Sequence, residues 1–164
     1  NDIDFHRGTF RVRGDVVDGD HILAIIAMAM SRRGELTGNT VVATVMANLG
    51  FMIAMRKAGI AVVETGVGDR YVLEAMRAGG FVLGGEQSGH VVMSEFATTG
   101  DGILTALHML AEVAESGQTL GELAARITKL PQVLINVKGV DRQALDGSAA
   151  VLDAVAEAEA PIVG

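Results

Sequence analysis

Between Gly84 and His90 the chain sets a carboxylate, a hydroxyl and an imidazole among glycines. Glu86, Ser88 and His90 stand at alternate positions, so an extended loop would project all three side chains to one side. A carboxylate accepts hydrogen bonds, a hydroxyl donates and accepts them, and an imidazole can do either, which suits the neighbouring hydroxyls of a sugar. The alternative is a hairpin in which Glu86 and Ser88 satisfy local backbone donors.

Two short apolar runs must position this loop. Residues 81–83 predict a buried strand before it, and residues 90–93 predict a second strand after it. The loop is therefore expected at a strand end, where glycines let the backbone turn tightly and approach a ligand closely.

The rest of the first 130 residues alternates strands with helices. Strands are expected at 9–12, 40–45 and 60–64, and helices at 20–30, 48–57, 69–77, 102–115 and 119–129. Asp20 is the expected N-cap of the first helix, which is apolar nearly all round and therefore buried. The predicted fold is α/β, a mostly parallel (mixed) four-stranded sheet flanked by helices, with one antiparallel hairpin at its edge.

The pattern restarts after Leu130. Pro131 breaks the preceding helix, residues 133–137 predict a strand, and a helix is expected from Gly147 or Ser148 to just before Pro161. Because one strand and one helix cannot bury both faces of a layer, residues 131–164 are interpreted as an incomplete β-α unit of a second domain. An exposed edge at 133–137 would favour a homodimer.

Composition restricts the class of partner. The net charge of −7 argues against nucleic acid or an anionic membrane. The longest apolar run, Ile22–Met30, is much shorter than the roughly 20 residues that cross a bilayer, and no signal peptide is visible. The chain has no cysteine, which is compatible with the cytoplasm. We therefore expect a cytoplasmic domain with a small-molecule ligand.

Three further residues are candidates for binding. The Gly66–Arg70 segment could present a helix N-terminus to an anion with Arg70 as a phosphate clamp; alternatively Asp69 is an N-cap and Arg70 forms an ion pair. Asn48 follows a strand, where α/β folds place ligand groups, but it is equally a plain N-cap. The Thr98–Gly102 segment is expected to cap a helix.

No metal site is expected from the histidines that lie on helical or terminal segments. His6, His21 and His108 have no partner ligands at the spacing of a zinc site.

Three motifs together resemble a known family. Gly85-Glu86-Gln87-Ser88-Gly89-His90, Thr98-Thr99-Gly100-Asp101-Gly102 and Val67-Gly68-Asp69-Arg70-Tyr71-Val72 are similar to the third domain of the α-D-phosphohexomutases. The resemblance runs from about Gly14 to Asn136. It implies that residues 1–130 are the sugar-binding third domain with an atypical N-terminal segment. Residues 131–164 would then begin the C-terminal phosphate-binding domain.

The resemblance also implies an activity. The family interconverts sugar 6-phosphates and 1-phosphates, here glucosamine 6-phosphate and glucosamine 1-phosphate, through a phosphoserine on another domain and with the help of Mg²⁺. Glu86 and Ser88 would hold the ring hydroxyls, and His90 would lie beside the reacting end of the sugar. Asp69 and Arg70 would border the active-site cleft.

Much of the family's machinery is not recognisable in this sequence. No phosphoserine loop is present, and Asp2 and Asp4 are out of register with the family's metal loop, so no catalytic residue and no metal ligand is assigned here. The chain is therefore expected to be inactive without the missing domains of the same enzyme, where Mg²⁺ would be held. Two alternatives are a free-standing sugar-phosphate-binding or structural module, and a fragment of a phosphoglucomutase or phosphomannomutase.

Overall fold

The computed structural model describes residues 3–6, 9–12, 15–133, 135, 138–139, 144 and 147–159. The chain divides into two compact units, Asn1–Pro131 and Gln132–Gly164. That residues 131–164 begin a further domain stays a prediction from the sequence. Among the described residues, no helix combines the length and apolarity that crossing a membrane requires.

The main sheet of the first unit has the strand order β5-β4-β6-β7. β4 (Thr40–Thr44) lies between β5 (Ala61–Thr65) and β6 (Leu83–Gly85) and is parallel to both, while β7 (Val91–Met93) runs antiparallel to β6 at the edge. Every residue of β4 is buried, as its largely β-branched sequence predicts for a strand covered on both faces. The predicted mixed, mostly parallel four-stranded sheet is confirmed.

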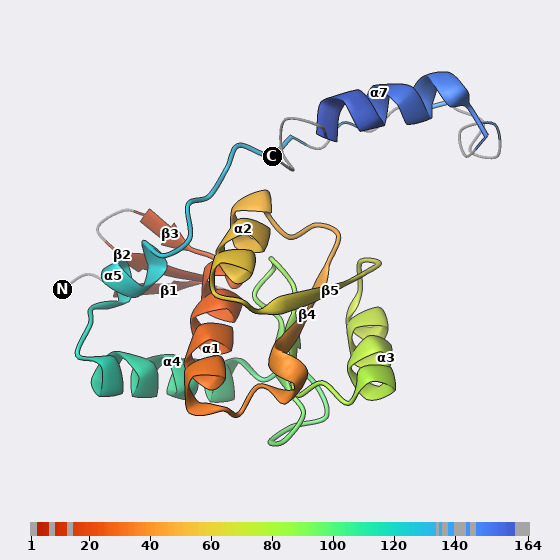
Figure 1. Cartoon of the computed structure of the whole chain (residues 1–164). Coiled ribbons are helices and arrows are strands. Elements are labelled where there is room, and N and C mark those ends of the chain that lie inside the picture. Colours follow the sequence, from red (N-terminus) through yellow and green to blue (C-terminus); the bar gives the residue numbers. More distant parts are fainter. Residues whose placement is uncertain are drawn as a thin grey trace. The chain divides into compact units, whose positions relative to one another are not determined.

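Side chains of β4 alternate between two cores on opposite faces of the sheet. Val41 and Ala43 belong to the larger core, whereas Val42 packs in the smaller one with Val72 and Met76. The larger core is covered by α1 (Gly19–Arg33), α2 (Leu49–Lys57), α4 (Gly102–Ser116) and α5 (Leu120–Ala124), and the smaller by α3 (Asp69–Gly79) (Figure 1). α1 is buried over most of its length, which confirms the interpretation of its apolar sequence.

The first helix begins earlier than the sequence predicts. Asp20 is the N-cap expected from the sequence, but the cap is Asp18, whose carboxylate accepts a hydrogen bond from the backbone N–H of His21 at 3.3 Å. Asp20 lies inside the first turn, where its carboxylate is buried. The prediction for Asp20 is therefore wrong, and its carboxylate has different partners.

Two other element boundaries move for local hydrogen-bonding reasons. β6 begins at Leu83 rather than at residue 81, because the backbone N–H of Phe81 donates to the Met76 carbonyl and closes the end of α3. α5 ends at Ala124 rather than near residue 129, because the backbone there tightens into turns that bond three residues back. The predicted capping box of Thr119 and Glu122 is present.

A second, three-stranded sheet at the N-terminus is predicted only in part. Its antiparallel order is β1-β2-β3, formed by Ile3–His6, Thr9–Val12 and Asp15–Val17. The sequence predicts the middle strand and misses the other two. Asp2 and Gly14 lie outside the described residues.

In the second unit the predicted helix is present as α7 (Ala149–Glu159). Of the strand expected at 133–137, Leu134, Asn136 and Val137 lie outside the described residues, and the described Val133 and Ile135 are not in a strand. A homodimer through this segment stays a prediction.

The start of α2 is tightly constrained by the chain that follows α5. A Cβ added at Gly50 would lie 2.0 Å from the backbone oxygen of Thr128, a contact that no side-chain rotation relieves. We expect Gly50→Ala to lower the free energy of unfolding by about 1–3 kcal/mol, as overpacking does. Gly102→Ala is the matched control, since nothing lies within 4 Å of its added Cβ, and its effect should stay within about 1 kcal/mol. Urea denaturation measures both, and equal effects would contradict the packing argument.

Candidate functional site

The loop between β6 and β7 is a closed hairpin turn rather than an extended segment. The backbone N–H of Glu86 donates to the His90 carbonyl at 2.9 Å, and that of Gly89 donates to the Glu86 carbonyl at 2.9 Å. Gly89 has a φ of 94°, a conformation that favours glycine. The observed backbone is therefore the hairpin that was given from the sequence as the alternative to an extended loop.

Glu86 contacts the start of α3. Its Oε1 accepts a hydrogen bond from the backbone N–H of Gly68 at 2.9 Å, and the Ser88 hydroxyl lies 3.5 Å from its Oε2. Gly68 is the N-cap of α3 and has a φ of 128°, which also favours glycine. One carboxylate oxygen thus satisfies a helix N-terminus, whereas the other, among the described residues, has only a long contact with the Ser88 hydroxyl.

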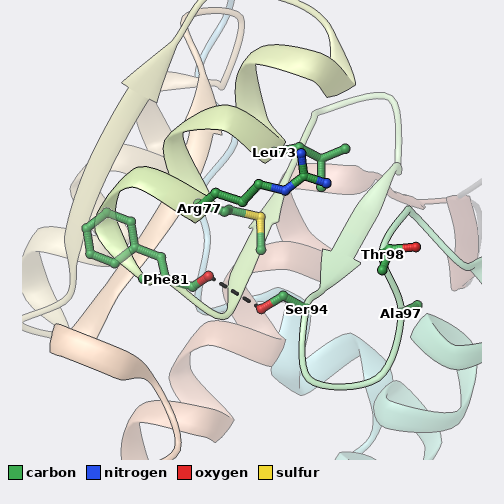
Figure 2. Close-up of a pocket in the computed structure, with 8 residues that line it drawn as sticks. Leu73, Arg77, Phe81, Ser94, Ala97 and Thr98 are labelled. Carbon is green, nitrogen blue, oxygen red and sulfur yellow. Dashed lines mark hydrogen bonds between the residues drawn. The ribbon is translucent and has the colours of Figure 1, made fainter.

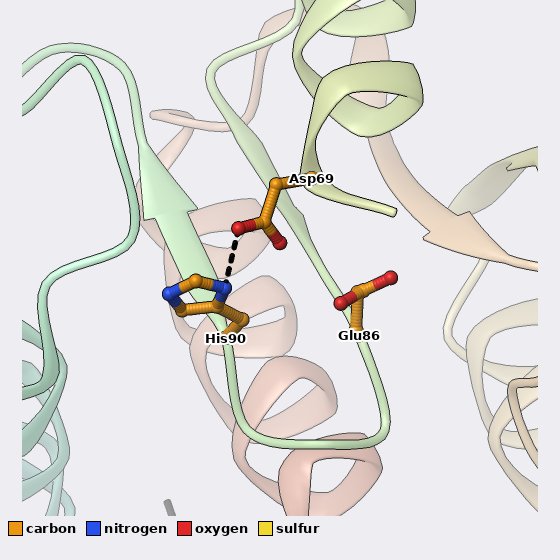
Figure 3. A group of neighbouring side chains, drawn as sticks. All are labelled: Asp69, Glu86 and His90. Carbon is orange, nitrogen blue, oxygen red and sulfur yellow. Dashed lines mark ion pairs between the residues drawn. The ribbon is translucent and has the colours of Figure 1, made fainter. Parts of the chain in front are cut away.

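Asp69 and His90 form an ion pair beside Glu86. Asp69 Oδ2 lies 2.6 Å from His90 Nδ1 (Figure 3). One carboxylate oxygen of Asp69, one of Glu86 and one ring nitrogen of His90 all lie within 4.8 Å of one another. The side chains of Asp69 and His90 are 40% and 49% exposed, so a ligand could reach this group from solvent. An Nδ1–H that donates to Asp69 leaves the other ring nitrogen of His90 to hold or accept a proton.

The Thr98–Gly102 segment packs against the imidazole and caps α4. A Cβ added at Gly100 would lie 2.6 Å from His90 Cδ2, so the glycine makes room for the ring. Asp101 caps α4 through hydrogen bonds from the backbone N–H groups of Ile103 and Leu104 at 2.9 and 3.0 Å. Its role here is the structural capping expected from the sequence.

Two of the six candidate binding residues lie apart from this group. Arg70 forms an ion pair with Glu74 at 2.7 Å, and its side chain is 82% exposed, as the alternative interpretation expects. The same alternative made Asp69 the N-cap of the helix, which is wrong, because the N-cap is Gly68. Asn48 caps α2 through the backbone N–H of Gly50 and also bonds both backbone groups of Leu130, so it matches its structural alternative. The structure therefore brings together Glu86, Ser88, His90 and Asp69, but it brings neither Arg70 nor Asn48 to them.

A separate pocket of about 320 Å³ lies at the other end of α3 and of the β6–β7 hairpin. Its lining combines the apolar side chains of Leu73 and Met76 with Arg77, and the Ser94 hydroxyl donates to the Phe81 carbonyl at its floor (Figure 2). None of the candidate binding residues lines it. The pocket is therefore not part of the Asp69–Glu86–His90 group.

A buried polar cluster that sequence reasoning missed lies at the first turn of α1. The Asp18 carboxylate lies 2.7 Å from His21 Nδ1 and forms an ion pair with Lys129. Burial alone would raise the pKa of Asp18, but the hydrogen bonds and charges of His21 and Lys129 outweigh it and hold the pKa at about 2. The signal in the sequence that could have indicated this cluster is the pair Asp18 and Asp20 before the apolar run, of which only Asp20 is assigned from the sequence.

Asp18 should make stability depend on pH in the acid range. Its pKa lies below the ordinary value of 3.8, so its contribution is complete above about pH 4 and is lost as the pH falls towards 2. Asp18→Asn keeps a good N-cap but removes the charge, and we expect it to cost about 2 kcal/mol of unfolding free energy at pH 7. The difference from wild type should shrink to near zero at pH 2, as measured by urea denaturation across this range.

Asp101→Asn is the control for that prediction, because Asp101 is a second N-cap whose hydrogen bonds come from backbone amides. A cost as large for Asp101→Asn as for Asp18→Asn, or a difference that persists unchanged at pH 2, would contradict the charge argument.

The chain matches a known protein family over most of its length. Residues 18–130 match the family model described as phosphoglucomutase/phosphomannomutase, alpha/beta/alpha domain III. The chain is 66% identical over 149 residues to a phosphoglucosamine mutase of Frankia alni, and 62% identical over 149 residues to one of a Nocardioides species. Each match covers 91% of this chain and 33% of the relative, so the chain spans about a third of the length of these curated relatives.

Solved structures give the same fold. A putative phosphomannomutase of Thermus thermophilus superposes with a TM-score of 0.64 at 27% identity, over 71% of this chain and 26% of that one. An N-acetylphosphoglucosamine mutase of Aspergillus fumigatus, in complex with GlcNAc-6P and magnesium, superposes with a TM-score of 0.65 at 23% identity, over 87% and 37%. Because the family model matches most of its residues, the chain belongs to the phosphoglucomutase/phosphomannomutase family, as the α/β/α domain III.

Proposed function

We propose that this chain is the sugar-binding part of a phosphoglucosamine mutase, an enzyme that interconverts glucosamine 6-phosphate and glucosamine 1-phosphate. The observation that carries the proposal is the open group of Asp69, Glu86 and His90, with Ser88 beside it, at the tip of the β6–β7 hairpin. Relatives named phosphoglucosamine mutase at 66% and 62% identity favour glucosamine over the glucose and mannose of the broader family.

Each side chain has a role in holding the sugar. Glu86 Oε1 is held by the backbone N–H of Gly68, so Oε2 is the oxygen that accepts hydrogen bonds from ring hydroxyls. Ser88 adds a hydroxyl that can donate or accept. His90, held at Nδ1 by Asp69, offers its other ring nitrogen to hold or move a proton beside the reacting end of the sugar.

Phosphoryl transfer itself needs groups that we assign to the remainder of the parent enzyme. A phosphoserine, a phosphate clamp and Mg²⁺ would supply the nucleophile, the positioning and the charge stabilisation. Asp69, Glu86 and His90 could hold a metal ion, but Mg²⁺ prefers an octahedron of oxygens, and one of these donors is an imidazole nitrogen. No Mg²⁺ ligand is therefore proposed among the described residues. We further propose a cytoplasmic location, which the cysteine-free sequence accommodates.

Binding of the sugar phosphate tests the proposal. Titration of the chain with glucosamine 1-phosphate should shift the backbone amide signals of residues 84–90. Glu86→Gln should weaken binding by about one to two decades, because its amide oxygen can still accept from Gly68 but no carboxylate oxygen is left for the sugar. Ser88→Ala should weaken it less, by about 0.5–1.5 kcal/mol.

Glu64→Gln, an exposed carboxylate on β5, is the matched control and should leave binding unchanged. If Glu86→Gln and Ser88→Ala lower the melting temperature but not the affinity, these side chains only stabilise the hairpin, and the proposed site is wrong.

The chain alone should show no mutase turnover. Holding one face of the sugar cannot replace a nucleophile, a metal and a phosphate clamp. A coupled assay for conversion of glucosamine 1-phosphate should read background with the purified chain at any concentration. Turnover that rises in proportion to the concentration of pure chain would show that the catalytic groups lie within these residues.

A further inference from the structure

The 86–90 loop rests directly on the first turn of α1. The backbone N–H of Gly19 donates to the Gln87 carbonyl at 3.1 Å. A Cβ added at Gly19 would lie 2.3 Å from the Glu86 carbonyl oxygen and 2.4 Å from the Gly89 nitrogen. Two backbones can approach this closely only where one residue is a glycine. The contact between the loop and α1 therefore depends on Gly19.

The side chain of Gln87 is held from the same turn. Its Nε2 donates to Asp20 Oδ2 at 3.1 Å, and the same oxygen accepts the backbone N–H of Asn48 at 2.8 Å. Asp20 is only 2% exposed. A buried carboxylate needs such donors, because it has given up its hydration. One carboxylate oxygen of Asp20 therefore links the first turn of α1 to the start of α2 and to the 86–90 loop.

The hairpin turn is thus held from two sides. On the open side, Glu86 and His90 contact the start of α3 through Gly68 and Asp69. On the covered side, Gln87 is bound to α1 by its backbone and its side chain. The open-side contacts use Glu86 Oε1 and His90 Nδ1, so a sugar would bind the remaining polar atoms of these side chains. The covered-side contacts involve no side chain of Glu86, Ser88 or His90.

We propose that Asp20 is a positioning residue, which acts through Gln87 to fix the turn that carries Glu86, Ser88 and His90. The identity of the ligand in this proposal rests on the proposed function, whereas the placement of the loop does not.

Hydrogen exchange of the loop amides tests the placement. The amides of Glu86 and Gly89 are hydrogen-bonded within the turn, so their exchange reports its opening. Gln87→Glu keeps the size of the side chain but sets a second carboxylate against Asp20. We expect it to speed exchange of these two amides by at least about tenfold, the effect of losing a hydrogen bond to a charged group, while the amides of β4 keep their wild-type rates.

Two further variants separate hydrogen bonding from packing. Gln118→Glu is the matched control: it makes the same replacement at a glutamine that bonds Arg126 elsewhere on the unit, and it should leave the loop unchanged. The double variant Asp20→Asn/Gln87→Glu removes one of the opposed charges and supplies an amide donor, so it should recover most of the protection lost in Gln87→Glu. If Gln87→Glu exchanges like the wild type, or only in step with the β4 amides, the proposal is overturned.

Titration with glucosamine 1-phosphate keeps this result separate from the proposed function. If the wild type binds and Gln87→Glu lowers the affinity about tenfold along with the loop protection, both proposals stand. If the wild type binds but Gln87→Glu alters neither affinity nor loop exchange, the positioning role fails and the function stands. If the wild type does not bind, the function fails, and the exchange rates alone decide the positioning role.

Discussion

The burial of two carboxylates in the first turn of α1 is the constraint on which the rest of this unit depends. Asp18 and Asp20 are 6% and 2% exposed at the edge of an aliphatic core. An unpaired carboxylate there would be strongly destabilising, so each must find donors. Asp18 finds His21 and Lys129, and Asp20 finds the backbone of Asn48 and the side chain of Gln87.

These donors come from segments far apart in the chain. The hydrogen bonds of the two aspartates therefore bring these segments together. Lys129 brings the chain after α5 to the start of α1, and the adjoining Leu130 bonds Asn48 at the start of α2. Burial also raises the pKa of Asp20, with the charge of Asp18 adding to it, while the hydrogen bonds from Asn48 and Gln87 oppose the shift. The 86–90 loop is one more segment that this turn holds in place.

The sequence predicted the parts of the fold that depend on local patterns. β4 is largely β-branched, α1 is apolar nearly all round, the Thr119–Glu122 capping box begins a helix as expected, and Asn48 caps a helix as its alternative interpretation expects. It predicted the parts that depend on distant partners poorly. Two aspartates precede the apolar run of α1, and local preference does not say which one caps the helix when the other is claimed by residues of α2 and the loop.

The candidate site shows the same division. The sequence predicts Glu86, Ser88 and His90 as one group because their types and spacing indicate a binding loop within one segment, and the structure places these side chains close together. The pairing of His90 with Asp69 joins two elements, and it could not be predicted before the parallel β4–β6 pairing set the hairpin beside the start of α3. β3 of the N-terminal sheet spans only Asp15–Val17, so periodicity carries little signal there.

The charge of the site determines which part of a sugar phosphate it can hold. Asp69 and Glu86 place two carboxylates within reach of one imidazole, in a chain whose net charge is −7. Two carboxylates repel a phosphate but accept hydrogen bonds from hydroxyls, and Arg70, which could have offset them, is paired with Glu74 on α3. The group is therefore suited to the uncharged face of the sugar. In the proposed mutase, whose substrate carries its phosphate at either end, a site that binds hydroxyls and leaves the phosphate to other domains would serve both orientations.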